Sequence, residues 1–262
     1  MMADYGKLTW PEIKEMDKDR VVILPVGAME DHGPHLPLDT DNLIIWEIAK
    51  GISEKIPDEV LLLPLIPFGF NEHHKDFPGV IYIQPETLLH FVVDITSSLA
   101  YHGFRRILIL NGHGSNHPVL DLAARKTVIA TECLCASVSY WNVIAETLRA
   151  NRRSRLGGMA HACELETSIY LYFDPAHVQL NKAAASIVHD DKSRYFCLDL
   201  MGGAKAMAMQ WWSAQTRDGT MGDPTVADPG QGKTFYEAAV SELVGLVMEM
   251  RRMQLKSRMD HH

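Results

Sequence analysis

Hydrophobic residues in the first 150 positions gather in short continuous runs separated by amphipathic stretches. The runs at 21–27 (VVILPVG), 60–68 (VLLLPLIPF), 107–110 (ILIL) and 133–141 (CLCASVSYW) predict buried strands. Strands that are apolar at every position are typical of a sheet covered on both faces, and such sheets are mostly parallel.

Helical patterns lie between and after these runs. We expect helices near 41–54, 86–101, 117–131, 161–173 and 232–255. The alternation of strand and helix predicts an α/β fold with a central, mostly parallel sheet flanked by helices. No repeat or linker interrupts the pattern, so we expect one domain over residues 1–262.

Composition narrows the class of protein. Of 262 residues 47% are hydrophobic and 22% are charged, which is enough for a large core. The net charge of -8 argues against nucleic acid or an anionic membrane as a partner. No apolar run approaches the roughly 20 residues of a membrane span, and no basic and apolar leader opens the chain, so we expect a cytoplasmic protein. Cys133 and Cys135 alternate within an apolar run and are expected in the core. Residues 260–262 are treated as a cloning remnant.

The loop after the first predicted strand is rich in metal-ligand residue types. Glu30 and His32 are two positions apart, so in an extended backbone their side chains point to the same side. Asp41 lies where the next helix begins, and a carboxylate is favoured there by the unpaired amides of the helix end. Asp41 is therefore either a metal ligand or a helix cap.

The loop after the strand at 107–110 carries His113 within NGHGSN. Glycines on both sides allow a sharp turn there, although a lone histidine is more often a loop or capping residue. Together the two loops supply two carboxylates and two imidazoles, a set that suits zinc or manganese, and Asp41 can bridge two ions. By spacing alone, His161 and Glu166 further on are interpreted as helix-start and surface residues.

Two further pairs have alternative roles. His74 is expected near the metals or the substrate, and its neighbour His73 is expected to be solvated. The pair Trp211 and Trp212 is expected to pack in the core or in a subunit interface rather than to line a pocket.

Three segments resemble the creatininase family, also called creatinine amidohydrolases. They are LPVGAMEDHGPHLPLDTD (24–41), NGHGSNHP (111–118) and HACELETS (161–168). Weaker similarities are His74 with FPG (77–79), SYW (139–141) and GTMGDPTVADPGQGK (219–233). The resemblance implies an α/β fold assembled as a hexamer, with two divalent ions (zinc, manganese or also iron) at the carboxyl ends of the strands.

The resemblance also implies a role for each residue that matches a motif. Glu30 and His113 would hold one ion, and His32 and Glu166 the other. Asp41 would bridge the two. His161 would be the catalytic histidine. The implied substrate-binding residues are Trp141, His74, Gly114 and Ser115.

Two departures from the family pattern concern the substrate. Creatinine hydrolases follow the turn histidine with Tyr and Glu, where this chain has Gly114 and Ser115. They carry Trp, Asp and Glu shortly before the later histidine, where this chain has Gly157, Gly158 and Ala160. The groups that hold a cyclic guanidine-like molecule are missing, so creatinine is not the expected substrate.

We therefore predict a metal-dependent hydrolase that cleaves a C–N bond of a small cyclic amide or formamide through a metal-bridging hydroxide. The alternatives are hydrolysis of a lactone or cyclic ketone, and a non-catalytic binding protein on the same fold. A nucleotide-binding oxidoreductase is disfavoured because Gly27-Ala28-Met29-Glu30 stands where G-x-G-x-x-G would be. A serine hydrolase is disfavoured because Ser115 lacks the G-x-S-x-G context.

Overall fold

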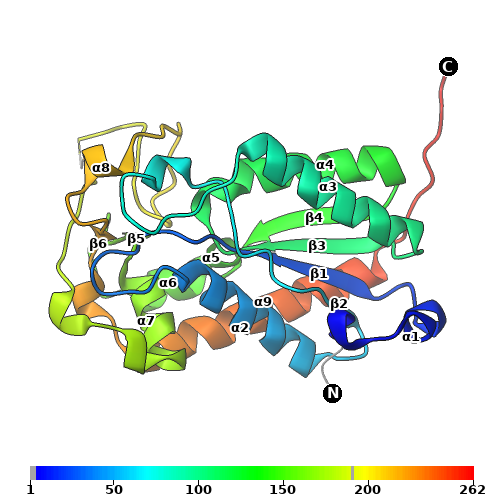
Figure 1. The fold of residues 1–262 in the computed structure, drawn as a ribbon, viewed down its shortest axis with the longest axis horizontal. Helices are drawn as coiled ribbons and strands as arrows, with labels where there is room; N and C mark the ends of the chain where they lie inside the picture. The colour runs from blue at the N-terminus through cyan, green and yellow to red at the C-terminus, as the bar shows by residue number, and fades with distance from the viewer. Residues whose placement is uncertain (1–3, 190–191) are drawn as a thin grey trace.

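The computed structural model describes residues 4–189 and 192–262 and is built around a four-stranded parallel sheet (Figure 1). The strand order is β2-β1-β3-β4, and each pair of neighbours is parallel. The strands are β1 (Val21–Val26), β2 (Val60–Leu62), β3 (Arg106–Asn111) and β4 (Leu134–Ser139). A second, antiparallel sheet pairs β5 (Met159–His161) with β6 (Met221–Gly222). The predicted α/β fold with a central parallel sheet is confirmed.

Helices cover both faces of the sheet. Helices α3 (Pro85–Tyr101) and α4 (His117–Thr131) lie on one face, and α2 (Thr40–Lys55) and α9 (Pro229–Arg252) lie on the other (Figure 1). Helix α7 (Glu164–Phe173) packs against α9 and α2. The shorter helices are α1 (Trp10–Glu15), α5 (Tyr140–Val143), α6 (Ala145–Asn151) and α8 (Trp212–Gln215). The 3-10 helices are Tyr5–Lys7, Glu72–His74, Gly114–Asn116, Pro175–His177, Leu180–Lys182 and Pro224–Val226.

Three predicted elements differ from those observed. The run at 60–68 forms a strand only at Val60–Leu62, since Pro64 and Pro67 lack the N–H that a strand ladder requires. The run at 133–141 leaves the sheet after Ser139, where α5 begins. The helix expected from 161 begins at Glu164, because His161 belongs to β5.

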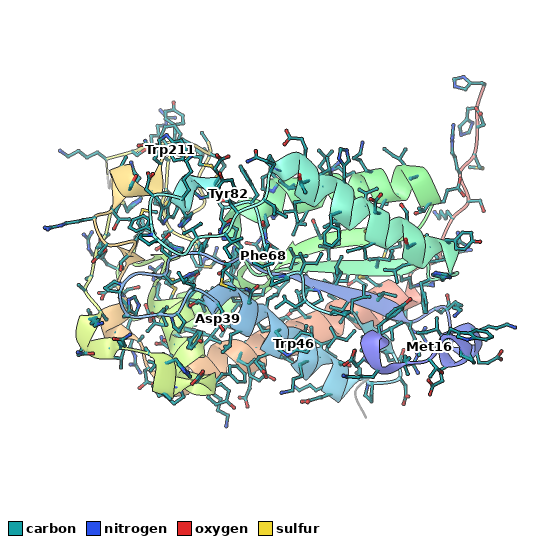
Figure 2. All side chains as sticks on the ribbon, viewed as in Figure 1. Met16, Asp39, Trp46, Phe68, Tyr82 and Trp211 are labelled. Carbon is teal, nitrogen blue, oxygen red and sulfur yellow. The ribbon has the colours of Figure 1, made fainter. Side chains whose placement is uncertain are left out.

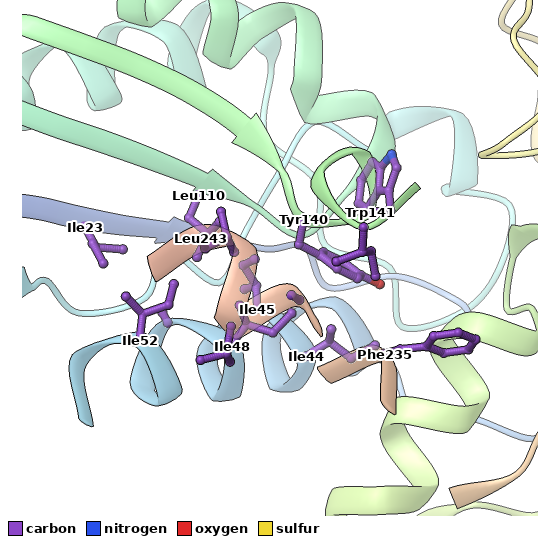
Figure 3. Close-up of a cluster of buried hydrophobic side chains, with 14 of the residues drawn as sticks. Ile23, Ile44, Ile45, Ile48, Ile52, Leu110, Tyr140, Trp141, Phe235 and Leu243 are labelled. Atoms are coloured by element: carbon purple, nitrogen blue, oxygen red, sulfur yellow. The ribbon is translucent and has the colours of Figure 1, made fainter. Parts of the chain in front are cut away.

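The apolar character of β1 follows from its burial on both faces. Val21 and Ile23 pack with residues of α2 and α9, such as Ile48 and Leu243 (Figure 3). Val22 and the alternate residues after it pack instead with residues of α3 and α4. Successive side chains of a strand point to opposite faces, so a strand between two helix layers is hydrophobic at every position.

The order in which strands are added to the sheet changes direction between β1 and β3, since β2 lies on one side of β1 and β3 on the other. The helix that follows β1 lies on one face of the sheet, and the helix that follows β3 lies on the other. Their last residues, Val26 and Asn111, are paired in register. In open α/β sheets, ligands bind outside the carboxyl ends of the strands where such a reversal occurs. The loops that carry Glu30 and His113 begin at this place.

No helix in the described part of the chain combines the length and the hydropathy that crossing a bilayer requires.

Candidate metal centre

The loop after β3 is fixed by the last residue of that strand. The Asn111 Nδ2 donates to the His113 carbonyl oxygen at 2.7 Å and to Ser139 Oγ at 2.9 Å. The His113 amide donates back to Asn111 Oδ1 at 3.1 Å. The backbone on both sides of the His113 ring is therefore held by one buried side chain.

Glycine at position 112 lets this loop rest on the first turn of α2. A Cβ at Gly112 would lie 2.8 Å from the Cβ of Ile45 and 2.9 Å from the Asp41 carbonyl oxygen. No other residue type fits at such a distance without displacement of the helix. The close approach brings His113 next to the Asp41 side chain.

Glu30, Asp41 and His113 form a first group of ligand-type side chains. His113 Nδ1 lies 3.1 Å from Glu30 Oε1 and 3.2 Å from Asp41 Oδ2. On the other side of the ring, His113 Nε2 donates to the Phe70 carbonyl oxygen at 3.3 Å. Because a carbonyl only accepts, neutral His113 carries its proton on Nε2, and the Nδ1 lone pair faces the two carboxylates.

A second group contains His32, Glu166 and the other oxygen of Asp41. His32 Nε2 lies 3.4 Å from Asp41 Oδ1 and 3.8 Å from Glu166 Oε1. Asp41 therefore presents one carboxylate oxygen to each histidine. That arrangement is the one a bridging carboxylate requires.

Glu166 is not the surface residue that spacing suggested. Its relative exposure is 9%, since α7 folds back against α2 and α9. Its Oε2 does accept the Cys163 amide at 3.1 Å, as a capping residue would, while Oε1 faces His32. Glu166 can therefore cap the helix through Oε2 while Oε1 is available to a metal ion.

His161 and His74 complete the cluster around Glu30. His161 Nε2 donates to the Asp31 carbonyl oxygen at 2.8 Å, so its Nδ1, 3.7 Å from Glu30 Oε1, is the free nitrogen. His74 Nδ1 lies 2.7 Å from Asp31 Oδ1, and its Nε2 lies 3.7 Å from Glu30 Oε2. Asp31 thus orients both imidazoles, as residues behind metal ligands commonly do. Sequence reasoning missed it, because the two-apart rule that selected Glu30 and His32 passes over the residue between them.

The backbone after His161 is strained. Ala162 has a φ of 49°, in the left-handed region that residues other than glycine rarely adopt. Such a conformation costs about 1–3 kcal/mol and persists where the surrounding structure imposes it, often at functional sites. This turn joins β5, which carries His161, to α7, which carries Glu166.

The charges of the cluster are arranged as a cation site. Burial raises the pKa of Glu30. Burial also acts to raise the pKa of Asp41, but His32 and His113 outweigh it and the pKa is lowered. Burial acts to lower the pKa of His113, but Glu30 and Asp41 prevail and raise it to about 10. In the absence of a cation, the carboxylates are thus balanced by protons on histidines, which divalent metals displace when they bind.

The available donor atoms fit divalent ions. Both oxygens of Glu30, one oxygen of Asp41 and Nε2 of His32 are buried and have no hydrogen-bond partner within the described residues. Three groups place their ligand atoms within 4.8 Å of one another: Glu30, Asp41 and His113; His32, His161 and Glu166; and Glu30, His74 and His161. Carboxylate and imidazole ligands suit zinc and manganese.

Of the four predicted substrate-binding residues, some lie at or near the cluster and one packs in the hydrophobic core. His74 belongs to the cluster, and Ser115 Oγ lies 3.1 Å from Nε2 of the adjacent His73. Gly114 faces open space, where a Cβ would meet nothing within 4 Å. Trp141 packs in the hydrophobic cluster on the α2 and α9 face beside Tyr140 (Figure 3), and its role in a pocket stays a prediction.

Two residues near the cluster contradict the expectations from sequence. His73 is buried rather than solvated, with a relative exposure of 6%, and burial lowers its pKa to about 3. Trp212 does not pack in the core, since its ring centroid lies 4.4 Å from that of His74 and 5.4 Å from that of His161, and its place in a subunit interface stays a prediction. No local signal marks either residue, because the segment around Trp212 has no regular hydrophobic period.

Comparison with known proteins identifies the family of this chain. The family described as creatinine amidohydrolase matches residues 6–247. A mycofactocin precursor peptide peptidase of Mycobacterium tuberculosis is 30% identical over 241 residues, which cover 85% of this chain and 82% of the relative. The creatinine amidohydrolase of Pseudomonas putida is 31% identical over 194 residues, which cover 68% of this chain and 74% of that enzyme.

Solved structures show the same fold. A putative creatinine amidohydrolase from Bacteroides fragilis superposes with a TM-score of 0.77 at 27% identity, over 98% of this chain and 99% of that one. A manganese form of creatininase superposes with a TM-score of 0.79 at 24% identity, over 97% of this chain and 100% of that one. Because the family match runs through nearly the whole chain and through all the cluster residues, this protein belongs to the creatininase family and is a metal-dependent hydrolase.

Proposed function

We propose that this chain hydrolyses a C–N bond of a small amide other than creatinine, a cyclic amide or a formamide, at a centre of two divalent ions. The observation that carries the proposal is the position of Asp41. One of its oxygens lies 3.4 Å from His32 Nε2 and the other 3.2 Å from His113 Nδ1, so a single carboxylate serves two ligand groups.

Each ligand group would hold one ion. Glu30 and His113 would bind the first, His32 and Glu166 the second, and Asp41 would bridge them. When bound, two zinc or manganese ions supply a hydroxide near neutral pH and polarise the substrate carbonyl. Iron is a further option for the same donors.

His161 is the residue we assign to proton transfer. Burial lowers its pKa, so the imidazole is neutral near pH 7. The bond from Nε2 to the Asp31 carbonyl oxygen leaves Nδ1 free on the side of Glu30. That nitrogen can accept the proton of the attacking water and pass it to the leaving nitrogen.

The relatives favour an amide substrate. They include a peptide peptidase, a creatinine amidohydrolase and, at 28% identity over 126 residues, a formylamino-pyrimidine deformylase of Methanobrevibacter ruminantium. The second candidate is hydrolysis of a lactone or cyclic ketone. It is supported by a 3-dehydro-scyllo-inosose hydrolase of Thermotoga maritima, which is 24% identical over 268 residues.

A substrate panel tests the proposal. Metal-free protein is incubated with zinc or manganese, its metal content is measured, and formamides, cyclic amides, dipeptides and lactones are assayed. We expect two ions per chain, with C–N cleavage that is lost on chelation and restored by added metal. Less than one ion per chain would refute the metal-centre assignment, and turnover of lactones alone would favour the second candidate.

We further propose that residues 1–262 act as one unit in a cytoplasmic homo-oligomer, a hexamer by family resemblance. Ile81 and Phe91, exposed by 51% and 49%, provide apolar surface of the kind that subunits bury. Light scattering on the purified protein measures the assembly directly, and a monomer would refute it.

A further inference from the structure

Helix α8 lies against the histidine-rich side of the metal centre, at the end of the molecule to which the strands β1, β3 and β4 point (Figure 1). The Trp212 ring centroid is 5.1 Å from that of His73 and 4.4 Å from that of His74. On the outer side, Ser213 Oγ donates to Asp76 Oδ2, and Lys75 Nζ lies 4.8 Å from the Trp211 ring. Trp211 itself is 49% exposed and lies at the far end of the molecule from Met16 (Figure 2).

Two buried nitrogens at this contact have no partner. Trp212 Nε1 and His73 Nδ1 are both buried and make no hydrogen bond with any part of the chain that the structure describes. His73 Nε2, by contrast, is 3.1 Å from Ser115 Oγ. Buried donors and acceptors are normally paired, since an unpaired one loses its hydrogen bonds to water without replacement. An indole N–H can only donate, so its partner has to be an acceptor.

The family's aromatic residue before the later histidine has no room here. A Cβ at Gly158 would lie 2.4 Å from the Cβ of Ser154 and 2.9 Å from the Arg155 carbonyl oxygen. Gly157 has a φ of 87°, and a Cβ there would lie 2.4 Å from the Cβ of His189. Gly157 and Gly158 therefore present no side chain to the centre, whereas Trp212 contacts the site histidines His74 and His161.

We propose that Trp212 and His73 form a substrate subsite beside the metal centre, in which the indole N–H binds a carbonyl or carboxylate oxygen of the substrate, with α8 covering the centre. This inference rests on the function proposed above. The ring excludes water from the centre, and the N–H selects against substrates that lack an acceptor, because such substrates leave it unpaired. His161 is 6% exposed and its ring lies 5.4 Å from that of Trp212, so in this proposal α8 moves for the substrate to enter.

Two metal-binding probes test the subsite without a known substrate. Acetohydroxamate carries only the chelating group, whereas succinic monohydroxamate adds a carboxylate arm. Their affinities are measured by calorimetry on zinc-loaded protein, for wild type, W212F, H73F and the exposed-neighbour control W211F. Because a hydrogen bond to a charged group is lost, W212F should weaken the carboxylate probe by roughly 10- to 100-fold and leave acetohydroxamate unchanged. H73F removes the unpartnered Nδ1 and should likewise weaken the carboxylate probe but not acetohydroxamate. W211F should bind both probes as wild type does.

The rate at which a chelator extracts zinc tests the cover. W212A, which removes the ring, should lose zinc several-fold faster than wild type, whereas W212F, which keeps a ring, should not. Equal extraction rates for W212A and wild type, with W212A folded by circular dichroism, would overturn the cover. Equal weakening of both probes by W212F, or of neither, would overturn the subsite. Failure of acetohydroxamate to bind zinc-loaded wild type would instead refute the proposed function, and the subsite with it.

Discussion

Replacement of Asp41 by Asn removes the carboxylate that links the two ligand groups while keeping the shape of the side chain. Asp41 is 2% exposed, and His32 and His113 hold its pKa low against the opposing effect of burial, so the group is a carboxylate. Its two oxygens lie 3.4 Å and 3.2 Å from the two imidazole nitrogens. An amide nitrogen cannot take the place of the second oxygen as a ligand. Asp41→Asn keeps one oxygen, so it is expected to remove a ligand from one ion and to weaken binding of the other through the loss of negative charge.

The expected fall in zinc affinity follows from the free energy of metal binding at a structural zinc site. Zinc binding by four protein ligands contributes about 10–16 kcal/mol, which is about 2.5–4 kcal/mol for each ligand. Loss of that ligand should weaken binding of one ion by about 70- to 900-fold. The loss of one anion from a cluster that also holds Glu30 and Glu166 adds to this effect, because fewer negative charges then attract the cations.

The assay is a zinc titration in competition with a chromophoric chelator, with metal content checked after desalting. Asp39→Asn is the matched control. Asp39 lies two positions earlier, and its Oδ1 accepts from the Tyr170 hydroxyl at 2.9 Å. That substitution should cost about 1 kcal/mol of stability and leave zinc affinity unchanged. If Asp41→Asn bound two ions with wild-type affinity, Asp41 would be only the helix cap that its position also allows.

Three further predictions concern other parts of the chain. His161→Ala should keep both ions and lose about 100- to 10,000-fold in turnover, and unchanged turnover would remove His161 from the mechanism. Zinc affinity should fall on acidification. The pKa of His113 is raised to about 10, since Glu30 and Asp41 outweigh burial, so the ion that displaces this proton binds about tenfold more weakly per pH unit below it. Competition titrations at pH 8 and pH 6 measure this change, and equal affinities would contradict it. In native protein at pH 8, a thiol reagent should react rapidly with Cys197 at most. The other three cysteines are buried, and burial raises the pKa of Cys135 to about 12. Rapid reaction of more than one thiol per chain would contradict their placement in the core.

Three consecutive residues have different roles in the proposed site: Glu30, Asp31 and His32. Glu30 and His32 face the ligand groups, while Asp31 supports them from behind. Its carbonyl oxygen holds His161, and its carboxylate holds His74. Fixing the second nitrogen of each imidazole determines which nitrogen is free, and outer partners of this kind commonly contribute 10- to 100-fold in metal affinity.

The sequence by itself predicted the elements and the loops that carry chemistry. The run at 21–27 appears as β1, and the helix expected at 117–131 is observed with the same bounds as α4. Both predictions rest on local periodicity, which is set by which faces an element buries. Glu30, His32, Asp41 and His113 could be selected together because the carboxyl ends of neighbouring parallel strands meet at one edge.

The tertiary structure decided which distant residues join that edge. Glu166 is buried because α7 packs against α2 and α9, and His73 is buried because Trp212, more than a hundred positions later in the chain, lies on it. Trp212, Asp31 and the orientation of each imidazole likewise depend on contacts between segments far apart in sequence. Local pattern records the periodicity of one element and carries no signal for its partner, so these parts of the site emerge only when the chain is folded.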